Sequence, residues 1–300
     1  MQAAGPAAQA ISEIAWLLFV GGAVIFAGVM LLLGWALRRR ATPLRPALWL
    51  IGGGVIFPAA VLVALFAYAL PRSPVWRPVP PADALVVSVT ARLWWWEVRY
   101  PGQAGSPEIV TANEIHIPVG QPVYLALASD DVIHSFWVPA LAGKMDMIPG
   151  RIQHLLLSAD QPGIYRGQCA EYCGEQHALM ALHVVAQSPE DFSAWRAAQA
   201  RPAAATPAQL ERGRQVFLAN RCDACHTVRG VTGNSRLGPD LTHVGSRWHL
   251  GAGTLPNTPE SLARWVAHVQ QVKPGARMPS YDWLDGESLT ALTHWLGSLK

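Results

Sequence analysis

The chain has 300 residues, of which 51% are hydrophobic and only 14% charged, with a formal net charge of +3. Soluble domains carry about 25% charged residues, so this composition excludes an ordinary soluble protein. The small net charge gives no basis for nucleic-acid binding. The apolar excess lies at the beginning of the chain, which indicates contact with a lipid bilayer.

Two long apolar segments follow a short N-terminal tail, residues 1–10. They predict a transmembrane hairpin over residues 11–71, with helices at about 14–37 and 47–70. Neither helix contains a charged residue, and each is long enough to cross ~30 Å of hydrocarbon. No lysine or arginine precedes the first segment, so it lacks the positive start of a signal peptide and is interpreted as a membrane helix, either already processed or retained.

The loop between these segments is rich in arginine, with Arg38, Arg39, Arg40 and Arg45. Basic loops stay on the cytoplasmic side of a membrane. We therefore expect a two-pass protein of the bacterial plasma membrane, with both termini on the periplasmic or outer side. Everything after Leu70 would then face outward.

A second domain is predicted over residues 82–187, after a proline-rich connector at Pro71–Pro81. Short β-branched runs separated by glycine and proline are typical of an all-β sandwich or barrel. The expected strands include Leu85–Ala91, Glu114–Pro118, Gln121–Ala128, Ile152–Leu157 and Ala181–Ala186.

A cluster of soft metal ligands lies near the end of this domain. Cys169, Cys173 and His177 are spaced four residues apart, and Met180 follows. Sulfur and imidazole ligands favour copper, zinc or an iron–sulfur cluster over hard cations. A structural zinc site is a closed set of four Cys and His ligands, whereas methionine is more typical of copper. A further nitrogen ligand is needed, and His134, beside a strand-like run, is our candidate.

The other two cysteines belong to a Cys-x-x-Cys-His motif at residues 222–226, the pattern of c-type haem attachment. In that chemistry Cys222 and Cys225 bind the haem covalently and His226 is the proximal iron ligand. Two disulfides would also account for the four cysteines of a periplasmic protein, but a disulfide has no use for an adjacent histidine. The motif therefore predicts one covalently bound haem c.

Residues 188–207 are predicted to form a short helix, at 188–199, and a linker rich in proline and alanine. Residues 208–300 are predicted to form an all-α domain. Its first helix would run to residue 222, with Thr206 as N-cap and Pro207 at the first position. Apolar residues from 289 to 299 have the spacing of a last helix, and Gly213 would let Trp295 approach closely.

Met278 is the only methionine in this third domain. It lies well downstream of the haem motif, on a predicted loop. A Met/His pair of axial ligands raises the haem potential and suits electron transfer. We therefore predict Met278 as the second axial ligand of the iron.

Three segments of the second domain resemble subunit 2 of haem–copper cytochrome c oxidases. They read His-Ser-Phe-Trp-Val-Pro from His134, Lys-x-Asp-x-Ile-Pro-Gly-Arg from Lys144, and Cys-Ala-Glu-Tyr-Cys-Gly-x-x-His-x-x-Met from Cys169. The resemblance implies a cupredoxin-like Greek-key barrel that holds a binuclear copper centre, CuA. The implied copper ligands are His134, Cys169, the backbone carbonyl of Glu171, Cys173, His177 and Met180.

The same resemblance implies two further roles. Trp94, the first of three adjacent tryptophans, is implied as the entry point for electrons. We expect the three on one strand, where successive side chains point to opposite faces. The side chain of Glu171 is implied to contribute to a Mg²⁺ shared with subunit 1, since a hard cation takes oxygen ligands.

The third domain resembles class I cytochrome c, with residues 238–241 as the turn at the haem edge. A CuA domain followed by a cytochrome c domain is similar to subunit 2 of caa-type oxidases. The fold class implied is a multidomain membrane protein: a two-helix hairpin, an all-β cupredoxin-like barrel and an all-α cytochrome c domain.

The resemblance implies an electron-entry subunit of a terminal cytochrome c oxidase. Electrons would pass from a donor, either cytochrome c or a quinol–cytochrome c reductase complex, through haem c to CuA. They would then reach the haem–copper site of subunit 1, which reduces O2 to water with proton pumping. The partners would be subunit 1 and further membrane subunits. The alternatives are a CuA-containing nitric oxide reductase subunit and a membrane-anchored electron carrier without a catalytic partner.

Overall fold

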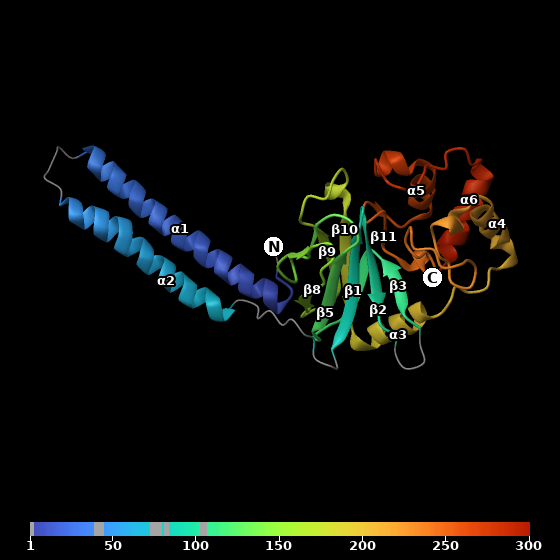
Figure 1. Ribbon diagram of the computed structural model, residues 1–300, viewed down its shortest axis with the longest axis horizontal. Helices are drawn as coiled ribbons and strands as arrows, with labels where there is room; N and C mark the ends of the chain where they lie inside the picture. The colour runs from blue at the N-terminus through green and yellow to red at the C-terminus, as the bar shows by residue number, and fades with distance from the viewer. Residues whose placement is uncertain (1–2, 39–44, 73–79, 81–83, 103–106) are drawn as a thin grey trace. The chain divides into compact units, whose positions relative to one another are not determined.

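The computed structural model describes residues 3–38, 45–72, 80, 84–102 and 107–300. The chain divides into two compact units, Pro6–Trp76 on the one hand and Met1–Gly5 with Arg77–Lys300 on the other (Figure 1). Most of the arginine-rich loop, at 39–44, and most of the predicted connector, at 73–79 and 81–83, lie outside the described residues.

The first unit is a helical hairpin. Helix α1 spans Pro6–Arg38, and the second arm runs without interruption through a π-helical segment at Leu48–Ile56, α2 at Phe57–Ala69 and a 3₁₀ turn at Leu70–Arg72. Both arms are long and apolar enough to cross a membrane, with mean hydropathies of 2.5 and 2.4. The tail predicted at residues 1–10 is shorter than expected, because α1 already begins at Pro6, and proline is favoured in the first turn of a helix.

The second unit begins with a sandwich of two five-stranded sheets. The first sheet has the order β3-β2-β1-β5-β8, with strands at Ile109–Ala112, Trp95–Tyr100, Leu85–Arg92, Val123–Ser129 and Gln153–Leu157. The second has the order β4-β10-β9-β6-β7, with strands at Glu114–Pro118, Ala181–Gln187, Gly163–Cys169, His134–Trp137 and Met145–Met147. The predicted all-β domain of cupredoxin type is confirmed.

The segments that carry the predicted copper ligands meet in the second sheet, where β6 pairs with β9. β1 pairs in parallel with β5, and β4 pairs in parallel with β10, while the other strand pairs are antiparallel. In β1 the side chains of Val87, Val89 and Ala91 are buried, and Ser88 between them is exposed. This alternation is the reason the segment is a half-buried strand. In the second sheet, Phe136 of β6 lies opposite Cys169 at the end of β9.

The prediction that three tryptophans alternate along one strand is wrong for Trp94. β2 begins at Trp95, and Trp94 lies in the turn that follows β1. A residue distant in the chain fixes this turn, because the backbone N–H of Leu93 donates to Asp131 Oδ2 at 2.8 Å. Trp96 is completely buried and contacts the ring of Phe136 edge-on.

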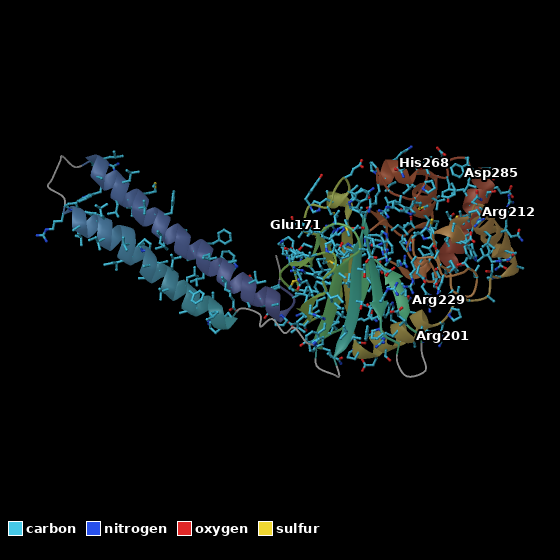
Figure 2. The ribbon with its side chains drawn as sticks, viewed as in Figure 1. Glu171, Arg201, Arg212, Arg229, His268 and Asp285 are labelled. Atoms are coloured by element: carbon cyan, nitrogen blue, oxygen red, sulfur yellow. The ribbon has the colours of Figure 1, made fainter. Side chains whose placement is uncertain are left out.

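A helix and a linker follow the sandwich. Helix α3 spans Pro189–Ala200, close to the predicted 188–199. Ser188 is its N-cap, and the hydroxyl accepts a hydrogen bond from Asp191 N at 3.0 Å. The side chain of Arg229, in the third domain, donates to the carbonyls of the last residues of α3 (Figure 2).

The third domain is helical, as predicted. Its elements are 3₁₀ turns at Ala208–Leu210, Cys222–Ala224 and Val244–Ser246, helices α4 at Glu211–Ala219, α5 at Pro259–Val272 and α6 at Gly286–Ser298, and a small ribbon of β11, His249–Leu250, with β12, Leu255–Pro256. The predicted N-cap at Thr206 is wrong. The hydroxyl of Thr206 instead lies 3.2 Å from Trp295 Nε1, which donates to it, so it joins the linker to the last helix.

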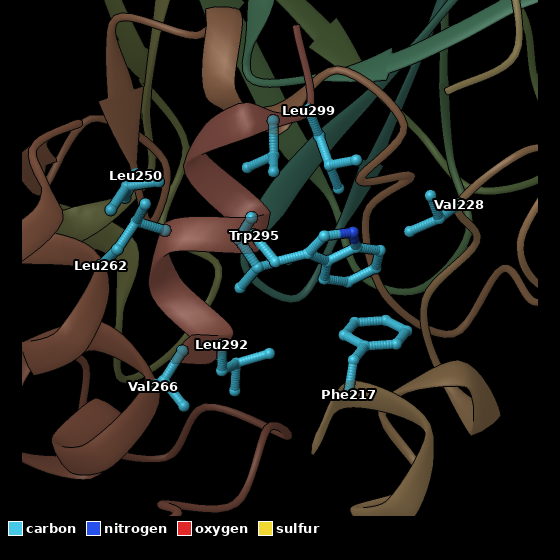
Figure 3. Packing of buried hydrophobic residues seen from close by; sticks show 10 residues of the cluster. Phe217, Val228, Leu250, Leu262, Val266, Leu292, Trp295 and Leu299 are labelled. Carbon is cyan, nitrogen blue, oxygen red and sulfur yellow. The ribbon is translucent and has the colours of Figure 1, made fainter. Parts of the chain in front are cut away.

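The core of this domain lies where α4 crosses α6 (Figure 3). Phe217 and Trp295 are both buried, with ring centroids 5.1 Å apart. The crossing is close because α4 carries a glycine there. A Cβ at Gly213 would lie 2.6 Å from Trp295 Cβ and 2.1 Å from the carbonyl oxygen of Ala291, which confirms the predicted approach of Trp295.

Candidate copper and haem sites

The soft ligands of the second domain converge on one buried cluster. His134, Cys169 and Cys173 are all buried, and their ligand atoms lie within 4.8 Å of one another. The two sulfur atoms are 3.7 Å apart, well beyond the ~2.05 Å of a disulfide bond. Two thiolates at this separation can bridge metal ions, whereas the disulfide alternative does not describe this geometry.

The remaining predicted ligands surround the two sulfurs. His177 Nδ1 lies 3.6 Å from Cys173 Sγ, and Met180 Sδ lies 4.0 Å from the same sulfur. The carbonyl oxygen of Glu171 lies 3.2 Å from Cys169 Sγ. The structure therefore brings all six predicted donors together. Two thiolates, two imidazoles, a thioether and one carbonyl form a set that suits copper.

Short local structure at each end of the cluster holds these donors. His134 is the first residue of β6, and the segment from Cys169 at the end of β9 loops back to Met180 through a 3₁₀ turn at His177–Leu179. The backbone closes the loop, because Cys169 N donates to the carbonyl of Met180 at 2.9 Å. Gly174 has a φ of 109°, which favours glycine in the loop.

The two cysteines have opposite shifts in pKa. The hydrogen bond from Cys173 lowers the pKa of Cys169 to about 3, and the same bond raises the pKa of Cys173. The pairing therefore favours the thiolate form of Cys169. Thiolates are the form that binds metal ions, so the site is prepared for a cation.

Asp131 orients one of the imidazoles. Its Oδ1 lies 2.7 Å from His134 Nε2, which donates to it, and His134 Nδ1 then faces Cys169 Sγ at 3.8 Å. A carboxylate on the distant nitrogen fixes the tautomer of a ligand histidine. The role of Asp131 was not predicted from the sequence. The available signal was an acidic residue three positions before a candidate ligand, in a polar turn.

The side chain of Glu171 points away from the copper cluster. It lies at the surface of the domain (Figure 2), and its carboxylate is 3.4 Å from Lys144 Nζ. The same ammonium is 2.7 Å from Asp146 Oδ1. Two carboxylates are thus available at this surface.

The haem motif of the third domain borders a cavity of about 500 Å³, a volume in the range of cofactor sites. Cys222, Cys225 and His226 line one side and Met278 also lines it, together with apolar side chains that include Phe217, Leu237, Tyr281, Leu292 and Leu296. The four predicted haem residues therefore border one cavity. A large flat apolar ligand with a covalent attachment fits this lining.

His226 is held in the orientation that an iron ligand needs. Its Nδ1 donates to the carbonyl oxygen of Pro239 at 2.7 Å, which leaves the lone pair of Nε2 free. Burial lowers the pKa of His226, so the ring stays neutral. Gly238 packs flat against this ring, and a Cβ there would lie 2.6 Å from His226 Cε1.

Two family models match the chain over these two sites. The model described as cytochrome c oxidase subunit II, periplasmic domain, matches residues 102–187, and the cytochrome c model matches residues 210–300. The chain thus carries a subunit II periplasmic domain followed by a cytochrome c domain. The subunit II domain implies copper, and the cytochrome c domain implies haem c.

Curated subunit II proteins match across both domains. Cytochrome c oxidase subunit 2 of Alkalihalophilus pseudofirmus is 39% identical over 73% of this chain and 62% of its own length. That of Bacillus sp. strain PS3 is 34% identical over 73% of this chain and 63% of its length. The chain thus spans slightly less than two thirds of these relatives. The periplasmic domain of subunit II from Bradyrhizobium japonicum is 32% identical over 39% of this chain and 93% of that one, with a TM-score of 0.35.

In this chain, the copper and haem domains are joined next to their ligand loops. The indole N–H of Trp94 donates to the carbonyl oxygen of Cys173 at 2.8 Å. Lys273, in the loop that leads to Met278, donates from Nζ to the carbonyl oxygen of Trp94 at 2.9 Å. Gln176, beside His177, donates from Nε2 to the carbonyls of Lys273 and Pro274. Trp94 therefore lies under the haem domain rather than on an open face.

A second group of contacts joins the domains farther along the interface. Buried Glu114 accepts hydrogen bonds from the backbone N–H groups of Trp248, at 2.6 Å, and His249, at 3.2 Å. The rings of His183 and His249 stack with centroids 4.0 Å apart. No sequence pattern predicted these contacts, because they form only where the third domain packs on strands β4 and β10.

Proposed function

We propose that this chain is the electron-entry subunit of a caa-type terminal cytochrome c oxidase. Electrons pass from a donor through haem c to a binuclear copper centre, CuA, and on to a subunit 1 that reduces O2 to water with proton pumping. One observation carries the proposal. The copper cluster and the haem cavity meet at Trp94, which lines the cavity and donates to the carbonyl of Cys173.

The proposed CuA ligands are the six donors of the buried cluster. Cys169 and Cys173 would bridge two copper ions, with His134 and His177 as the nitrogen ligands. Met180 and the carbonyl of Glu171 would complete the set. The support is the 3.7 Å separation of the sulfurs and the absence of any charged side chain other than Asp131 bonded to these donors among the described residues. A rigid, buried site of this kind suits rapid electron transfer.

The proposed haem ligands are the four residues that border the cavity. Cys222 and Cys225 would hold the haem covalently, and His226 and Met278 would be the axial ligands of the iron. Haem c supplies the electron storage, and the protein supplies its orientation and potential. The hydrogen bond from His226 to Pro239 supports this assignment, since it fixes the ring with Nε2 free.

The remaining parts of the proposal concern the surroundings of the subunit. The two apolar arms would cross the bacterial plasma membrane, with both domains on the periplasmic side. Subunit 1 and further membrane subunits would be the partners, and cytochrome c or a quinol–cytochrome c reductase complex the donor. Glu171 would supply one oxygen ligand to a Mg²⁺ shared with subunit 1.

The test is spectroscopy and kinetics on the purified protein in detergent. We expect the absorption bands of a low-spin haem c together with the electron paramagnetic resonance signal of a mixed-valence copper pair. After rapid reduction of the haem, the copper signal should change as electrons arrive. The intact complex should consume O2.

The control is the double variant Cys169→Ser with Cys173→Ser. It should lose the copper signal and retain the haem bands, because the two sites use different residues. A wild-type protein that carries haem c but no mixed-valence signal after loading with copper would overturn the CuA assignment. Uptake of nitric oxide without uptake of O2 by the purified complex would overturn the oxidase assignment.

A further inference from the structure

Cations from both domains border the haem cavity. Arg92 comes from the end of β1 in the copper domain, and Arg247 and Lys273 come from the haem domain. Of the two aspartates that also line the cavity, Asp130 pairs with Arg92 at 2.7 Å, and Asp131 is bonded to His134. Arg92 also lies 3.8 Å from Glu97, whereas Arg247 and Lys273 form no ion pair among the described residues.

Two of the guanidinium groups have buried donors that are not used. Arg92 Nε and Arg247 Nε are inaccessible to solvent and have no hydrogen-bond partner among the described residues. Arg92 uses Nη2 for Asp130, and Arg247 uses Nη2 for the carbonyl of Asp240 and for Thr111 Oγ1. A buried charged donor without an acceptor is costly. Both arginines line the cavity, so a group bound there would lie beside two guanidinium groups whose hydrogen bonds are incomplete.

Lys273 likewise has incomplete hydrogen bonds. The residue is only 3% exposed, and its ammonium, which has three donors, makes one hydrogen bond, to the carbonyl of Trp94. Burial lowers the pKa of Lys273 to about 8. An anion beside it would stabilise the protonated form. Lys273 and Trp94 both line the cavity, so that anion would stand at the boundary between the domains.

A haem brings anionic groups of the right kind into such a cavity, because the porphyrin carries two propionate carboxylates. Guanidinium groups bind carboxylates through paired N–H donors, and an ammonium adds a further charged hydrogen bond. We propose that the haem propionates are bound across the domain boundary, by Arg92 of the copper domain together with Arg247 and Lys273 of the haem domain. This inference rests on the proposed function, in that a haem occupies the cavity.

One consequence is that the copper domain completes the haem site. Arg92 follows Ala91 in β1 and precedes the turn that carries Trp94, whose indole reaches Cys173. Lys273 contacts the same tryptophan from the other domain. A propionate bound to Lys273 would therefore be linked, through two further hydrogen bonds, to the backbone of a copper ligand. The haem would then also fix the position of the two domains relative to each other.

The test uses Arg92→Met in the purified full-length protein, with haem and copper contents measured first. Resonance Raman spectra report the hydrogen bonding of haem propionates through their bending modes, and a redox titration gives the haem potential. We expect the propionate band to shift and the haem potential to fall, because a cation near the haem favours the reduced, less positive iron. Lys273→Met should give changes of the same sign.

Two variants are the matched controls. Arg92→Lys keeps the charge and should retain most of the wild-type potential, and Arg264→Met removes an exposed cation of α5 and should leave both readouts unchanged. If Arg92→Met fails to fold, Lys273→Met still decides. A wild-type protein without haem c would refute the proposed function. Normal haem content with an unchanged propionate band and potential in both Met variants would overturn only this inference.

Discussion

At the scale of single residues, the copper cluster depends on one carboxylate that is not a ligand. Asp131 accepts from His134 Nε2 and from the backbone N–H groups of Leu93 and Val132. It therefore fixes both the imidazole and the turn in which Trp94 lies. Partners of this kind orient metal ligands and are needed for tight binding.

The first prediction concerns this carboxylate. Asp131→Ala should lower the copper affinity about 10–100-fold, because His134 loses the acceptor that orients its ring. Competition with a copper chelator measures the affinity. Asp130→Ala is the matched control, because Asp130 is the neighbouring acid and pairs with Arg92 instead. Equal affinities for wild type and Asp131→Ala would show that the ring is held by packing alone.

At the scale of elements, the crossing of α4 and α6 fixes the back of the haem cavity. Leu292 and Leu296 of α6 line the cavity, and Phe217 of α4 does the same. The two helices come this close because Gly213 has no side chain at the point of contact. A small displacement of α6 would therefore change the shape of the haem site.

The second prediction tests this crossing. Gly213→Ala should destabilise the haem domain by about 1–3 kcal/mol, because the added methyl group meets the backbone of Ala291 and cannot be avoided by a rotamer change. Thermal unfolding followed by haem absorption measures the effect. Gly286→Ala is the control, since a Cβ at Gly286 meets nothing within 4 Å. Similar melting temperatures for the two variants would contradict the argument.

At the scale of the whole molecule, buried polar contacts join the copper and haem domains. Glu114 is 3% exposed and lies on β4 of the copper domain, and both of its backbone partners belong to the haem domain. A hydrogen bond to a buried charge contributes about 1.5–3 kcal/mol. The interface is thus held by an ionic acceptor whose loss leaves two N–H groups unpaired.

The third prediction follows from this acceptor. Glu114→Ala should reduce the free energy of interaction between the copper and haem domains by about 1–3 kcal/mol for each unpaired donor. Denaturant unfolding of the detergent-solubilised chain, followed by copper and by haem absorption, should then give two separate transitions in place of coincident ones. Glu108→Ala is the control, because Glu108 is exposed and pairs with Arg99 of the copper domain itself. Coincident transitions in Glu114→Ala would disprove the role.

The fourth prediction concerns the stacked histidines at the same interface. Burial, with a smaller contribution from neighbouring His249, lowers the pKa of His183 to about 4. Of the weaker effects, Glu114 raises this pKa and Arg166 lowers it. The unfolded chain, with a histidine pKa near 6.5, binds more protons than the folded one between these values. Stability should therefore fall as the pH drops from about 6.5 to 4.

Unfolding midpoints measured across this pH range check that prediction. His183→Asn should flatten the dependence, because the residue that gains a proton on unfolding is gone. His268→Asn, at an exposed position of α5 (Figure 2), should retain the slope of the wild type. An unchanged slope in His183→Asn would assign the pH dependence to other groups.

The sequence was sufficient for the fold class, and its limits are seen at particular residues. Hydropathy predicted both apolar helices, and the two cysteine motifs, with the resemblance to subunit 2, predicted the candidate donors of each site. It failed for Trp94 and Thr206, where contacts distant in the chain decide: Asp131 fixes the turn before Trp95, and Trp295 engages the Thr206 hydroxyl. Local preference cannot anticipate such partners.

The sequence alone therefore determined which residues are the candidate metal and haem ligands, because soft ligands at short spacing and the haem attachment motif are local patterns. The tertiary structure decided how the two sites are related. Lys273 and Trp94 are 179 residues apart in the chain and meet at 2.9 Å, and Arg92 reaches the haem cavity from another domain. These contacts depend on how the two domains pack on each other, and no pattern within either segment encodes that packing.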